Sequence, residues 1–411
     1  MRILIVTAGS RGDVAPFTGL GRRLRDAGHE VAVAAHPSFA ALVTGCGLAH
    51  RPVPGDPQEL LRAWSRAASR EETRALTRAY ADGLADGVAD AVAAGTDLVL
   101  TAFGPAPLSR TAGAAFGVPV VGTYLTPAFA TARFALPGAR SSDGTGPRDR
   151  LAAGRAVLAR AEGVFAGAVA RLRDRFGLPD GTPSAAGDLR PVFHGYSPLV
   201  VPRPGDWPSG VGVSGYWWPA RPDGWRPPAE LADFLGAGPP PVFIGFGSMA
   251  PGEGERLGEL VTSAVRRAGV RAVVQAGWAG LNGSGSGSDS DVLAIGDVPH
   301  DWLFPRTAAV VHHAGAGTTG AGLRAGVPAL PVPVMADQPF WASRLCELGV
   351  APRALPFHDL TAEALADAIG ACVSEPSHRH RAGALARRIT AEDGAAPVLA
   401  HIEGRTPAGA G

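Results

Sequence analysis

The chain has 411 residues, more than one hydrophobic core usually organises, so its length predicts two domains. The formal net charge of +1 provides no field that would attract nucleic acid or an anionic membrane. All basic residues are arginine, and the lack of lysine excludes the Walker phosphate-binding loop and Schiff-base chemistry.

The cysteines and the hydropathy indicate a cellular compartment. Cys46, Cys346 and Cys372 are far apart, form no metal or redox spacing, and suggest reducing conditions. No apolar run is long enough to span a bilayer, and Met1–Ala8 lacks the pattern of a cleaved leader. We therefore expect a cytoplasmic protein with no integral membrane association.

Apolar runs alternate with helical patterns in the first half of the chain. Four runs predict buried parallel strands: Arg2–Thr7, Val31–Ala35, Asp97–Thr101 and Val118–Tyr124. Phe17, Leu20 and Leu24 repeat at helical spacing after the first run, and Leu60–Val92 and Leu151–Phe176 also have helical patterns. This alternation predicts an α/β fold with a parallel sheet.

The second half repeats this organisation after Leu199–Asp223, a stretch rich in proline and aromatic residues. We expect a linker there, at residues 206–220. Pro241–Gly247 is again an apolar strand that ends in a glycine turn. The remaining predicted strands are Arg271–Gln275, Val292–Ile295, Ala308–His312 and Ala329–Val334, and Thr361–Val373 and His378–Ile389 are predicted helices.

Val310–Val334 predicts a strand, a glycine-rich turn, a short helix over Thr318–Ala325, and another strand. Backbone N–H groups of such a turn and a helix N-terminus can bind an anion. His313 at the mouth of the turn could donate to a phosphate oxygen. The same pattern also suits a turn whose glycines serve packing beside a satisfied histidine, and both interpretations remain open.

Two carboxylates also follow predicted strands. Asp13 comes after a glycine loop and could act as a general base, or it could be the N-cap of a helix starting near Ala15. Asp337 and Gln338 could bind sugar hydroxyls, or could belong to an ordinary polar loop. Asp289 and Asp291 match an Asp-x-Asp metal signature but lie in a Gly/Ser tract typical of a solvated loop, so we predict no metal site.

Seven short motifs in order resemble the GT-B glycosyltransferases of family 1. The resemblance is to the branch of sterol glucosyltransferases and actinobacterial, glycopeptide-type antibiotic glycosyltransferases, and it covers most of the chain. The motifs are Gly9–Pro16, Ser197–Trp207, Gly245–Met249, Gly277–Leu281, Val298–Pro305, His312–Thr319 and Asp337–Trp341.

The resemblance implies two Rossmann-like domains with a cleft between them. Residues 1–205 would bind the acceptor, 221–390 would bind the nucleotide sugar, and 391–411 would return towards the N-terminal domain and end in a disordered tail. It makes Asp13 the base and His313 the phosphate ligand. The implied donor-binding residues are Ser10, Ser248, Val298, Pro299, His313, Gly315, Ala316, Gly317, Thr318, Asp337 and Gln338.

One departure from the family pattern concerns the nucleoside. Many relatives carry a ribose-binding glutamate eight positions after the phosphate-binding histidine, where this chain has Ala321. The resemblance therefore leaves UDP and dTDP sugars open as donors. It implies an inverting transfer of a hexose to a hydroxyl group, with no cofactor besides the donor substrate.

The acceptor pocket is expected in segments that carry several aromatic residues, which suggest a small apolar natural-product aglycone. The candidates are Trp64, Tyr80, Phe129 and Phe134, although the same rings could be core. Alternatives on the same fold are a sugar-nucleotide epimerase and a non-catalytic auxiliary protein. We expect a monomer or homodimer whose partners are the acceptor and the nucleotide sugar, with no nucleic acid.

Overall fold

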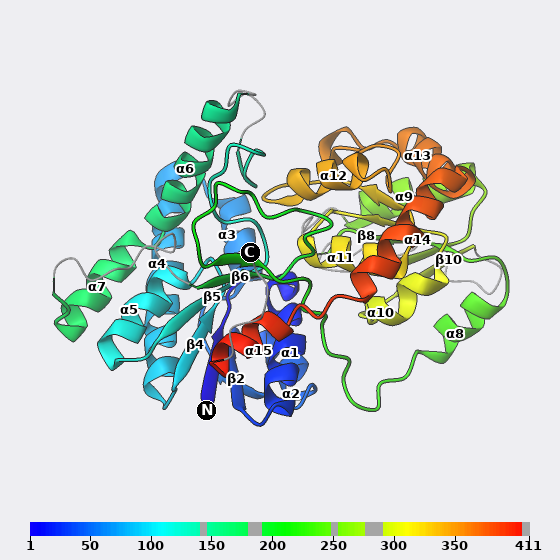
Figure 1. The fold of residues 1–411 in the computed structure, drawn as a ribbon. Coiled ribbons are helices and arrows are strands. Elements are labelled where there is room, and N and C mark those ends of the chain that lie inside the picture. The colour runs from blue at the N-terminus through cyan, green and yellow to red at the C-terminus, as the bar shows by residue number, and fades with distance from the viewer. Residues whose placement is uncertain (140–145, 180–190, 248–253, 276–290, 405–411) are drawn as a thin grey trace. The chain divides into compact units, whose positions relative to one another are not determined.

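The computed structural model describes residues 1–139, 146–179, 191–247, 254–275 and 291–404. The chain divides into two compact units, Met1–Asp223 with Asp393–Gly411, and Gly224–Glu392 (Figure 1). Each unit contains a parallel sheet with helices on its faces, which confirms the predicted α/β class.

The first unit contains a seven-stranded parallel sheet with the order β3-β2-β1-β4-β5-β6-β7. Its strands are β1 Arg2–Val6, β2 Glu30–Ala35, β3 Ala49–Pro52, β4 Leu98–Thr101, β5 Val120–Tyr124, β6 Val192–His194 and β7 Val211–Val213. Its α-helices are α1 Arg11–Asp26, α2 Ala40–Thr44, α3 Pro57–Arg66, α4 Arg70–Ala93, α5 Ala106–Phe116, α6 Pro147–Gly163, α7 Ala166–Phe176 and α15 Ala396–Ile402.

The second unit contains a five-stranded parallel sheet with the order β10-β9-β8-β11-β12. Its strands are β8 Val242–Gly245, β9 Ala272–Gln275, β10 Val292–Ile295, β11 Ala309–His312 and β12 Ala329–Pro331. Its α-helices are α8 Ala229–Gly236, α9 Gly254–Ala268, α10 His300–Leu303, α11 Ala316–Ala325, α12 Gln338–Glu347, α13 Ala362–Ser374 and α14 Pro376–Thr390.

Both sheets have the same strand order around the first strand of their unit. β1 lies between β2 and β4, and β8 lies between β9 and β11. In each sheet, the strands that come next in the chain are therefore added on one side of the first strand, and the later strands are added on its other side. In open α/β sheets, ligands bind outside the carboxyl ends of the strands at such a switch point. The β1–β4 and β8–β11 strand ends are therefore the places to look for a site.

Apolar strand runs follow from burial on both faces of the second sheet. In β8, Val242 and Ile244 pack into one cluster with α9 and α13, whereas Phe243 packs into the opposite cluster with Leu303 and Phe304. Alternate residues of β9 and β11 divide in the same way. Because neither face meets water, every position of a central strand favours an apolar residue.

The helical pattern over Leu60–Val92 proved to be two helices, α3 and α4, rather than one. Ser69 ends the break between them, where its Oγ accepts a 3.1 Å hydrogen bond from the N–H of Glu72. A serine cap of this kind begins a new helix. The pattern over Leu151–Phe176 is likewise divided, into α6 and α7.

Residues 206–220, expected as a linker, lie wholly in the first unit and include its edge strand β7. Trp207, Tyr216 and Trp217 are buried there. The Trp217 indole donates a 2.8 Å hydrogen bond to the Gly394 carbonyl, which fastens the C-terminal segment to this unit. The aromatic residues that marked the stretch in the sequence are therefore packing residues of the first unit.

His194 at the end of β6 is fully buried in an aromatic cluster. Its ring stacks on Trp207 with centroids 4.8 Å apart and lies 5.4–5.9 Å from the rings of Tyr124, Phe129 and Tyr196. Nδ1 donates a 2.9 Å bond to the Gly212 carbonyl, and burial lowers the His194 pKa to about 4. The neutral imidazole is the form that this core accepts.

We predict that His194 makes the first unit sensitive to acid. Its folded pKa of about 4 lies below the ordinary value of 6.5, so the unfolded chain binds the proton first and stability falls as pH drops from about 6.5 to 4. His194→Phe should lose about 2 kcal/mol less stability than wild type between pH 7 and pH 5, measured by urea unfolding followed by tryptophan fluorescence. The exposed His380→Phe should keep the wild-type loss, and an unchanged loss in His194→Phe would refute the assignment.

Candidate functional site

The turn after β1 holds the carboxylate of Asp13 in a fixed position. Helix α1 begins at Arg11 with Ser10 as its N-cap, so Asp13 lies in the first turn and not at the cap, and the helix starts before the expected Ala15. The N–H and Oγ of Ser10 donate to Asp13 Oδ2 at 2.7 and 3.1 Å. This capping box orients the carboxylate at the carboxyl end of β1.

The surroundings of Asp13 leave little freedom. Thr7 Oγ1 donates to the Asp13 carbonyl at 2.7 Å, and Gly9 has φ +131° with its Cα directly beside the Asp13 carboxylate. A Cβ on Gly9 would collide with that carboxylate. The Ser10 hydroxyl donates a hydrogen bond to Asp13. The family resemblance implied a different role for Ser10, a contact with the nucleotide-sugar substrate.

Tyr80 on α4 is close enough to Asp13 for the carboxylate charge to affect the Tyr80 pKa. Burial, together with the smaller effect of the negative charges of Asp13 and Asp56, raises the pKa of Tyr80 to about 12. The ring packs on the backbone of Gly55, where a Cβ would lie 2.7 Å from Tyr80 Cε2. Tyr80 therefore keeps its phenolic proton at neutral pH and can donate a hydrogen bond near Asp13.

The other three aromatic candidates lie in different environments. Trp64 on α3 is 37% exposed, and Phe134 is half-buried outside regular secondary structure. Phe129 is buried in the cluster of His194, where its carbonyl accepts a 3.0 Å bond from the Trp207 indole. The Phe129 ring is therefore packed in the core, and the acceptor contact expected of it stays a prediction.

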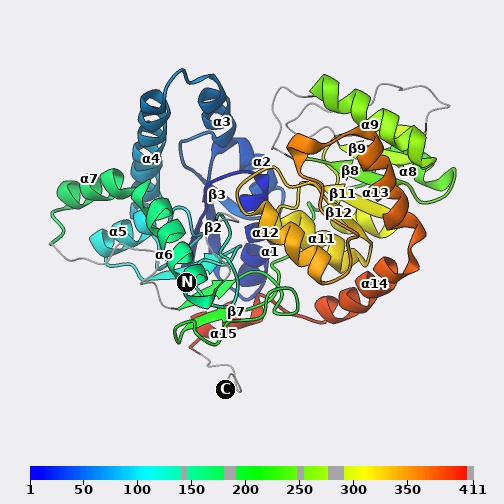
Figure 2. The ribbon, with the colours of Figure 1, turned by 90° about the horizontal axis from the view of Figure 1, so that it is seen from above.

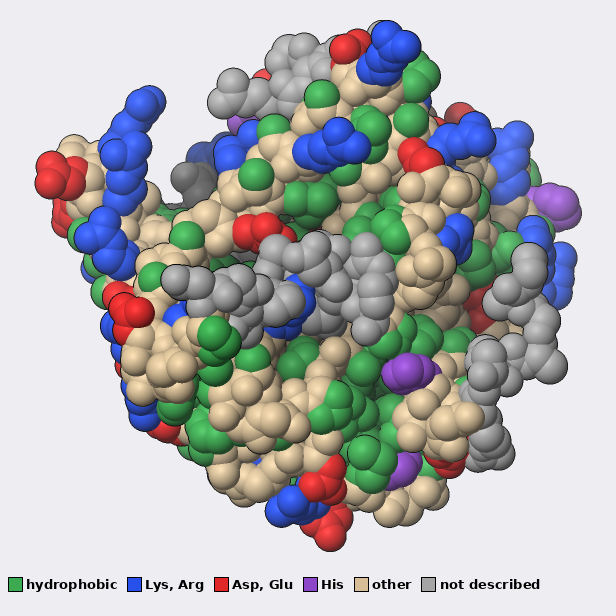
Figure 3. All heavy atoms as spheres, turned by 60° about the vertical axis from the view of Figure 1, so that its left-hand side comes forward, with side chains coloured by type: hydrophobic (Ala, Val, Ile, Leu, Met, Phe, Trp, Pro, Cys, Tyr) green, Lys and Arg blue, Asp and Glu red, His purple; other side chains and the backbone are tan. Residues whose placement is uncertain are grey.

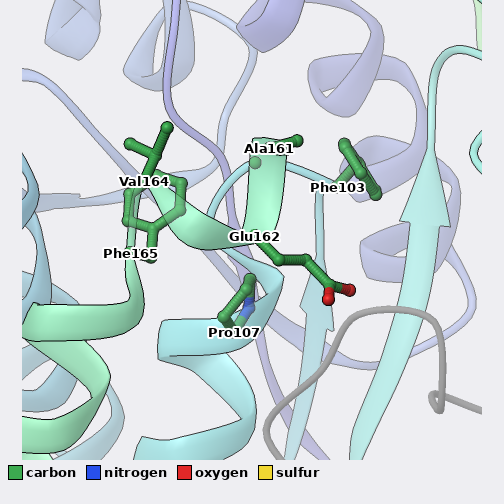
Figure 4. Close-up of a pocket in the computed structure, with 7 residues that line it drawn as sticks. Phe103, Pro107, Ala161, Glu162, Val164 and Phe165 are labelled. Atoms are coloured by element: carbon green, nitrogen blue, oxygen red, sulfur yellow. The ribbon is translucent and has the colours of Figure 1, made fainter. Parts of the chain in front are cut away.

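A cavity of about 200 Å³ opens beside the end of β4 (Figure 4). It is lined by residues that follow β4 and by the junction of α6 and α7: Phe103, Gly104, Pro107, Ala161, Glu162, Val164 and Phe165. Ala102 donates its N–H to the Val6 carbonyl, so the cavity follows the strand next to β1. The lining is apolar apart from Glu162. The sequence pattern predicted the strand before Phe103 and Pro107 but did not indicate that these two residues line a cavity.

The second candidate turn joins β11 to α11. Ala314 is buried and has φ +63°, a left-handed conformation that costs an alanine about 1 kcal/mol or more. His312 Nδ1 accepts a 3.1 Å bond from the Ala314 N–H and thereby holds the turn closed. The helix begins at Ala316, two residues before the expected Thr318.

His313 projects from this turn between two glycines. A Cβ on Gly247 would lie 2.8 Å from its Cε1, and a Cβ on Gly315 would lie 2.5 Å from its Nε2. Burial lowers the His313 pKa to about 4, and the nearby Gly245 backbone offsets only part of this effect. Nδ1 is buried without a hydrogen-bond partner among the described residues. His313 is therefore a neutral imidazole at pH 7.

The first turn of α11 offers backbone donors beside His313. Gly315 is the N-cap, and its carbonyl accepts the Thr319 N–H at 2.9 Å. The N–H groups of Ala316, Gly317 and Thr318 precede that first intrahelical bond and, at a helix N-terminus, can bind an anion. The structure thus brings together the histidine and the backbone donors that the sequence indicated.

Asp337 and Gln338 lie at the start of α12 with different functions. Trp341 Nε1 donates a 2.8 Å bond to Asp337 Oδ2, and burial raises the Asp337 pKa. Gln338 Oε1 accepts the N–H groups of Val334 and Met335 at 2.8 and 3.0 Å. The carbonyl of Gln338 therefore shapes the loop, and only its amide nitrogen is left to face a ligand.

The other residues expected to bind the donor substrate lie in the core, near the surface, or outside the described residues. Val298 is buried in the core cluster of the second unit, so only its backbone is available, whereas Pro299 is half-buried at the N-cap of α10. Ala321 packs against the same cluster, and its methyl side chain offers no hydrogen-bonding group. Ser248 lies outside the described residues, as does Asp289.

Two further features bear on the chemistry. Among the described residues, no three His, Cys, Asp or Glu side chains gather in a way that could hold a metal ion. The same residues include no helix with the length and apolar character needed to cross a membrane.

Comparison with protein families gives matches at both ends of the chain. Residues 3–89 match the glycosyltransferase family 28 N-terminal domain, and residues 286–404 match the erythromycin biosynthesis protein CIII-like C-terminal domain. The N-terminal match includes the Asp13 turn, and the C-terminal match includes the His313 turn and Asp337.

Two curated relatives extend over nearly the whole chain. O-mycaminosyltylonolide 6-deoxyallosyltransferase of Streptomyces fradiae is 38% identical over 98% of this chain and 97% of its own length. A sterol 3-beta-glucosyltransferase of Arabidopsis thaliana is 31% identical over 97% of this chain, which spans 64% of that longer protein.

Solved structures share the fold at lower identity. The glycosyltransferase of kitacinnamycin superposes with a TM-score of 0.71 at 22% identity over 99% of both chains. The glycosyltransferase VinC in complex with dTDP has a TM-score of 0.68 at 22% identity, over 98% of this chain and 100% of its own. Together with the 38% identity to the Streptomyces fradiae transferase, this shows that the chain belongs to the family 1 GT-B glycosyltransferases and is a glycosyltransferase.

Proposed function

We propose that the protein transfers a hexose from a UDP- or dTDP-sugar to a hydroxyl group of a small, apolar natural-product aglycone, with inversion at the anomeric carbon. The observation that carries this proposal is the turn from β11 to α11, where a neutral His313 with a buried Nδ1 stands beside backbone donors of a helix N-terminus. A diphosphate is the anion that such a set of neutral donors suits.

The proton and the electron pairs move as follows in the proposed reaction. Asp13 accepts the proton of the acceptor hydroxyl while that oxygen forms a bond to the anomeric carbon. The bond between this carbon and the diphosphate oxygen breaks at the same time. The charge that develops on the leaving group is stabilised by a neutral N–H of His313 and by the N–H groups of Ala316, Gly317 and Thr318.

The donor sugar fits the start of α12. The carboxylate of Asp337 is held by Trp341 and can accept hydrogen bonds from sugar hydroxyls, while the amide nitrogen of Gln338 can donate one. Two observations bear on which nucleoside the donor carries. Two structural relatives are complexes with thymidine diphosphate, and Ala321 provides no polar ribose ligand. Both UDP and dTDP donors remain within the proposal.

The cavity beside β4 is proposed to receive an apolar part of the acceptor. Its volume of about 200 Å³ is smaller than a pocket for a whole drug-sized ligand, so it would hold one portion of the aglycone. The position at the strand next to β1 puts it on the switch point that also carries Asp13.

Replacing the proposed base should stop transfer without preventing donor binding. Asp13→Asn keeps the shape of the side chain but cannot accept the proton, so turnover should fall by about 10²–10⁴-fold. Gly9→Ala should also lower kcat, because its Cβ displaces the Asp13 carboxylate. The matched control Asp26→Asn, at the end of the same helix, should remain active. Near-normal turnover of Asp13→Asn would refute the base assignment.

Removing the His313 imidazole should weaken the product complex. His313→Ala deletes one donor to a charged ligand, so the Kd for UDP or dTDP in calorimetry should rise about 10-fold or more. The exposed His380→Ala should leave this Kd unchanged. Unchanged affinity of the His313 variant would contradict the phosphate role.

The cavity predicts a selective effect on the acceptor. Val164 lines it and is 42% exposed, so Val164→Asp introduces a charge at an apolar surface without emptying the core. The acceptor KM should rise about 10-fold while the donor KM stays constant. Val373→Asp on α13, at a residue of similar 41% exposure, should change neither value. If both KM values of Val164→Asp match wild type, the cavity is not the acceptor subsite.

A further inference from the structure

Helix α4 carries a regular row of charged residues that the transfer reaction does not use. Every fourth residue of its length is charged, with three arginines followed by three aspartates: Arg70, Arg74, Arg78, Asp82, Asp86 and Asp90. Residues four apart lie next to each other on a helix, so each half of the row forms a continuous ridge of one charge.

The aspartate half of this row is covered by α7. Arg171 Nη1 lies 2.9 Å from Asp86 Oδ1, and Arg171 Nε lies 3.4 Å from Asp82 Oδ1. Four residues later, Arg175 reaches Asp86 at 3.2 Å and Asp90 at 3.8 Å. Two arginines four residues apart on α7 thus form ion pairs with three aspartates four residues apart on α4. This is how a second helix can neutralise such a ridge.

The arginine half has no such cover. Arg70, Arg74 and Arg78 are exposed and form no ion pair within the described residues. The row turns by about 40° around the helix at each step, so its arginine part faces about 120° away from its aspartate part. Helix α7 ends at Phe176, and its Arg171 and Arg175 pair with the aspartates.

The surroundings of this arginine ridge suit a macromolecular partner. Helix α3 packs against α4 to form a hairpin that projects from the first unit, and it carries the partly exposed Trp64 (Figure 2). Figure 3 shows arginine side chains gathered along a protruding part of the surface. Like charges four residues apart destabilise a helix, so this arrangement has a cost that a bound acidic surface would remove.

We propose that the Arg70–Arg74–Arg78 ridge binds an acidic helix of a partner protein whose carboxylates recur every four residues. The recognition would repeat, with the charges exchanged, the match that α7 makes with Asp82, Asp86 and Asp90. Trp64 lies on the adjoining helix of the same hairpin and offers an aromatic contact for the partner. None of the three arginines is among the residues proposed to carry out the transfer reaction.

A peptide pair tests this spacing directly. A stapled alanine-rich helix with three glutamates four residues apart is compared with a peptide of equal composition whose glutamates are unevenly spaced. Fluorescence anisotropy at low salt with the full chain should show at least 10-fold tighter binding of the regular peptide, and added salt should weaken it. Arg70→Glu/Arg74→Glu/Arg78→Glu should abolish this preference.

The matched control reverses three exposed arginines on other helices, Arg155→Glu/Arg160→Glu/Arg387→Glu, and should bind the regular peptide as wild type does. Circular dichroism confirms that both triple variants are folded. Equal binding of the two peptides, no binding of either, or equal losses in both triple variants would overturn the proposal. So would ridge-dependent binding to anionic vesicles together with no discrimination between the peptides.

Discussion

The strand order of the two sheets is the constraint on which the rest of the structure depends. Each sheet grows away from its first strand in both directions, so the carboxyl ends of β1 and β4, and of β8 and β11, have no crossover helix between them. Asp13, the cavity at Phe103 and the His313 turn all follow one of these strands. Within each unit, parallel pairing thus puts these turns at the carboxyl edge of the sheet, with no need for a specific contact between their side chains.

Close backbone packing then fixes the individual groups. Ala314 and Ala336 have φ values of +63° and +58°, and each directly follows or precedes a proposed ligand-binding residue. Such strain persists only where the surroundings hold it, and here the His312 ring bonds the first turn while Gln338 bonds the second loop. Gly9, Gly247 and Gly315 serve the same purpose by leaving room for the Asp13 and His313 side chains. The two turns therefore present preorganised groups rather than flexible ones.

Sequence patterns predicted most of this arrangement, and their failures have physical reasons. Continuous apolar runs located the central strands, and the residues after them included Asp13, His313 and Asp337. The short strands β3, β6 and β7, at or next to the sheet edges, have no such run, so the sequence pattern does not distinguish them from loops. Phe129 and Gln338 could not be assigned because a ring or an amide looks the same whether it serves the core or a ligand. Only tertiary contacts reveal that Phe129 packs on Trp207 and that Gln338 bonds Val334.

Product analysis is the most direct test of the proposed transfer of a hexose to an acceptor hydroxyl. The full chain is incubated with UDP- and dTDP-hexoses and a panel of hydroxylated polyketide, peptide and terpenoid aglycones, followed by mass spectrometry and NMR. We expect an acceptor enlarged by one hexosyl unit, an equivalent of nucleoside diphosphate, and an anomeric configuration opposite to that of the donor. Recovery of an epimerised sugar nucleotide without glycoside, or a glycoside with the donor's configuration, would contradict it.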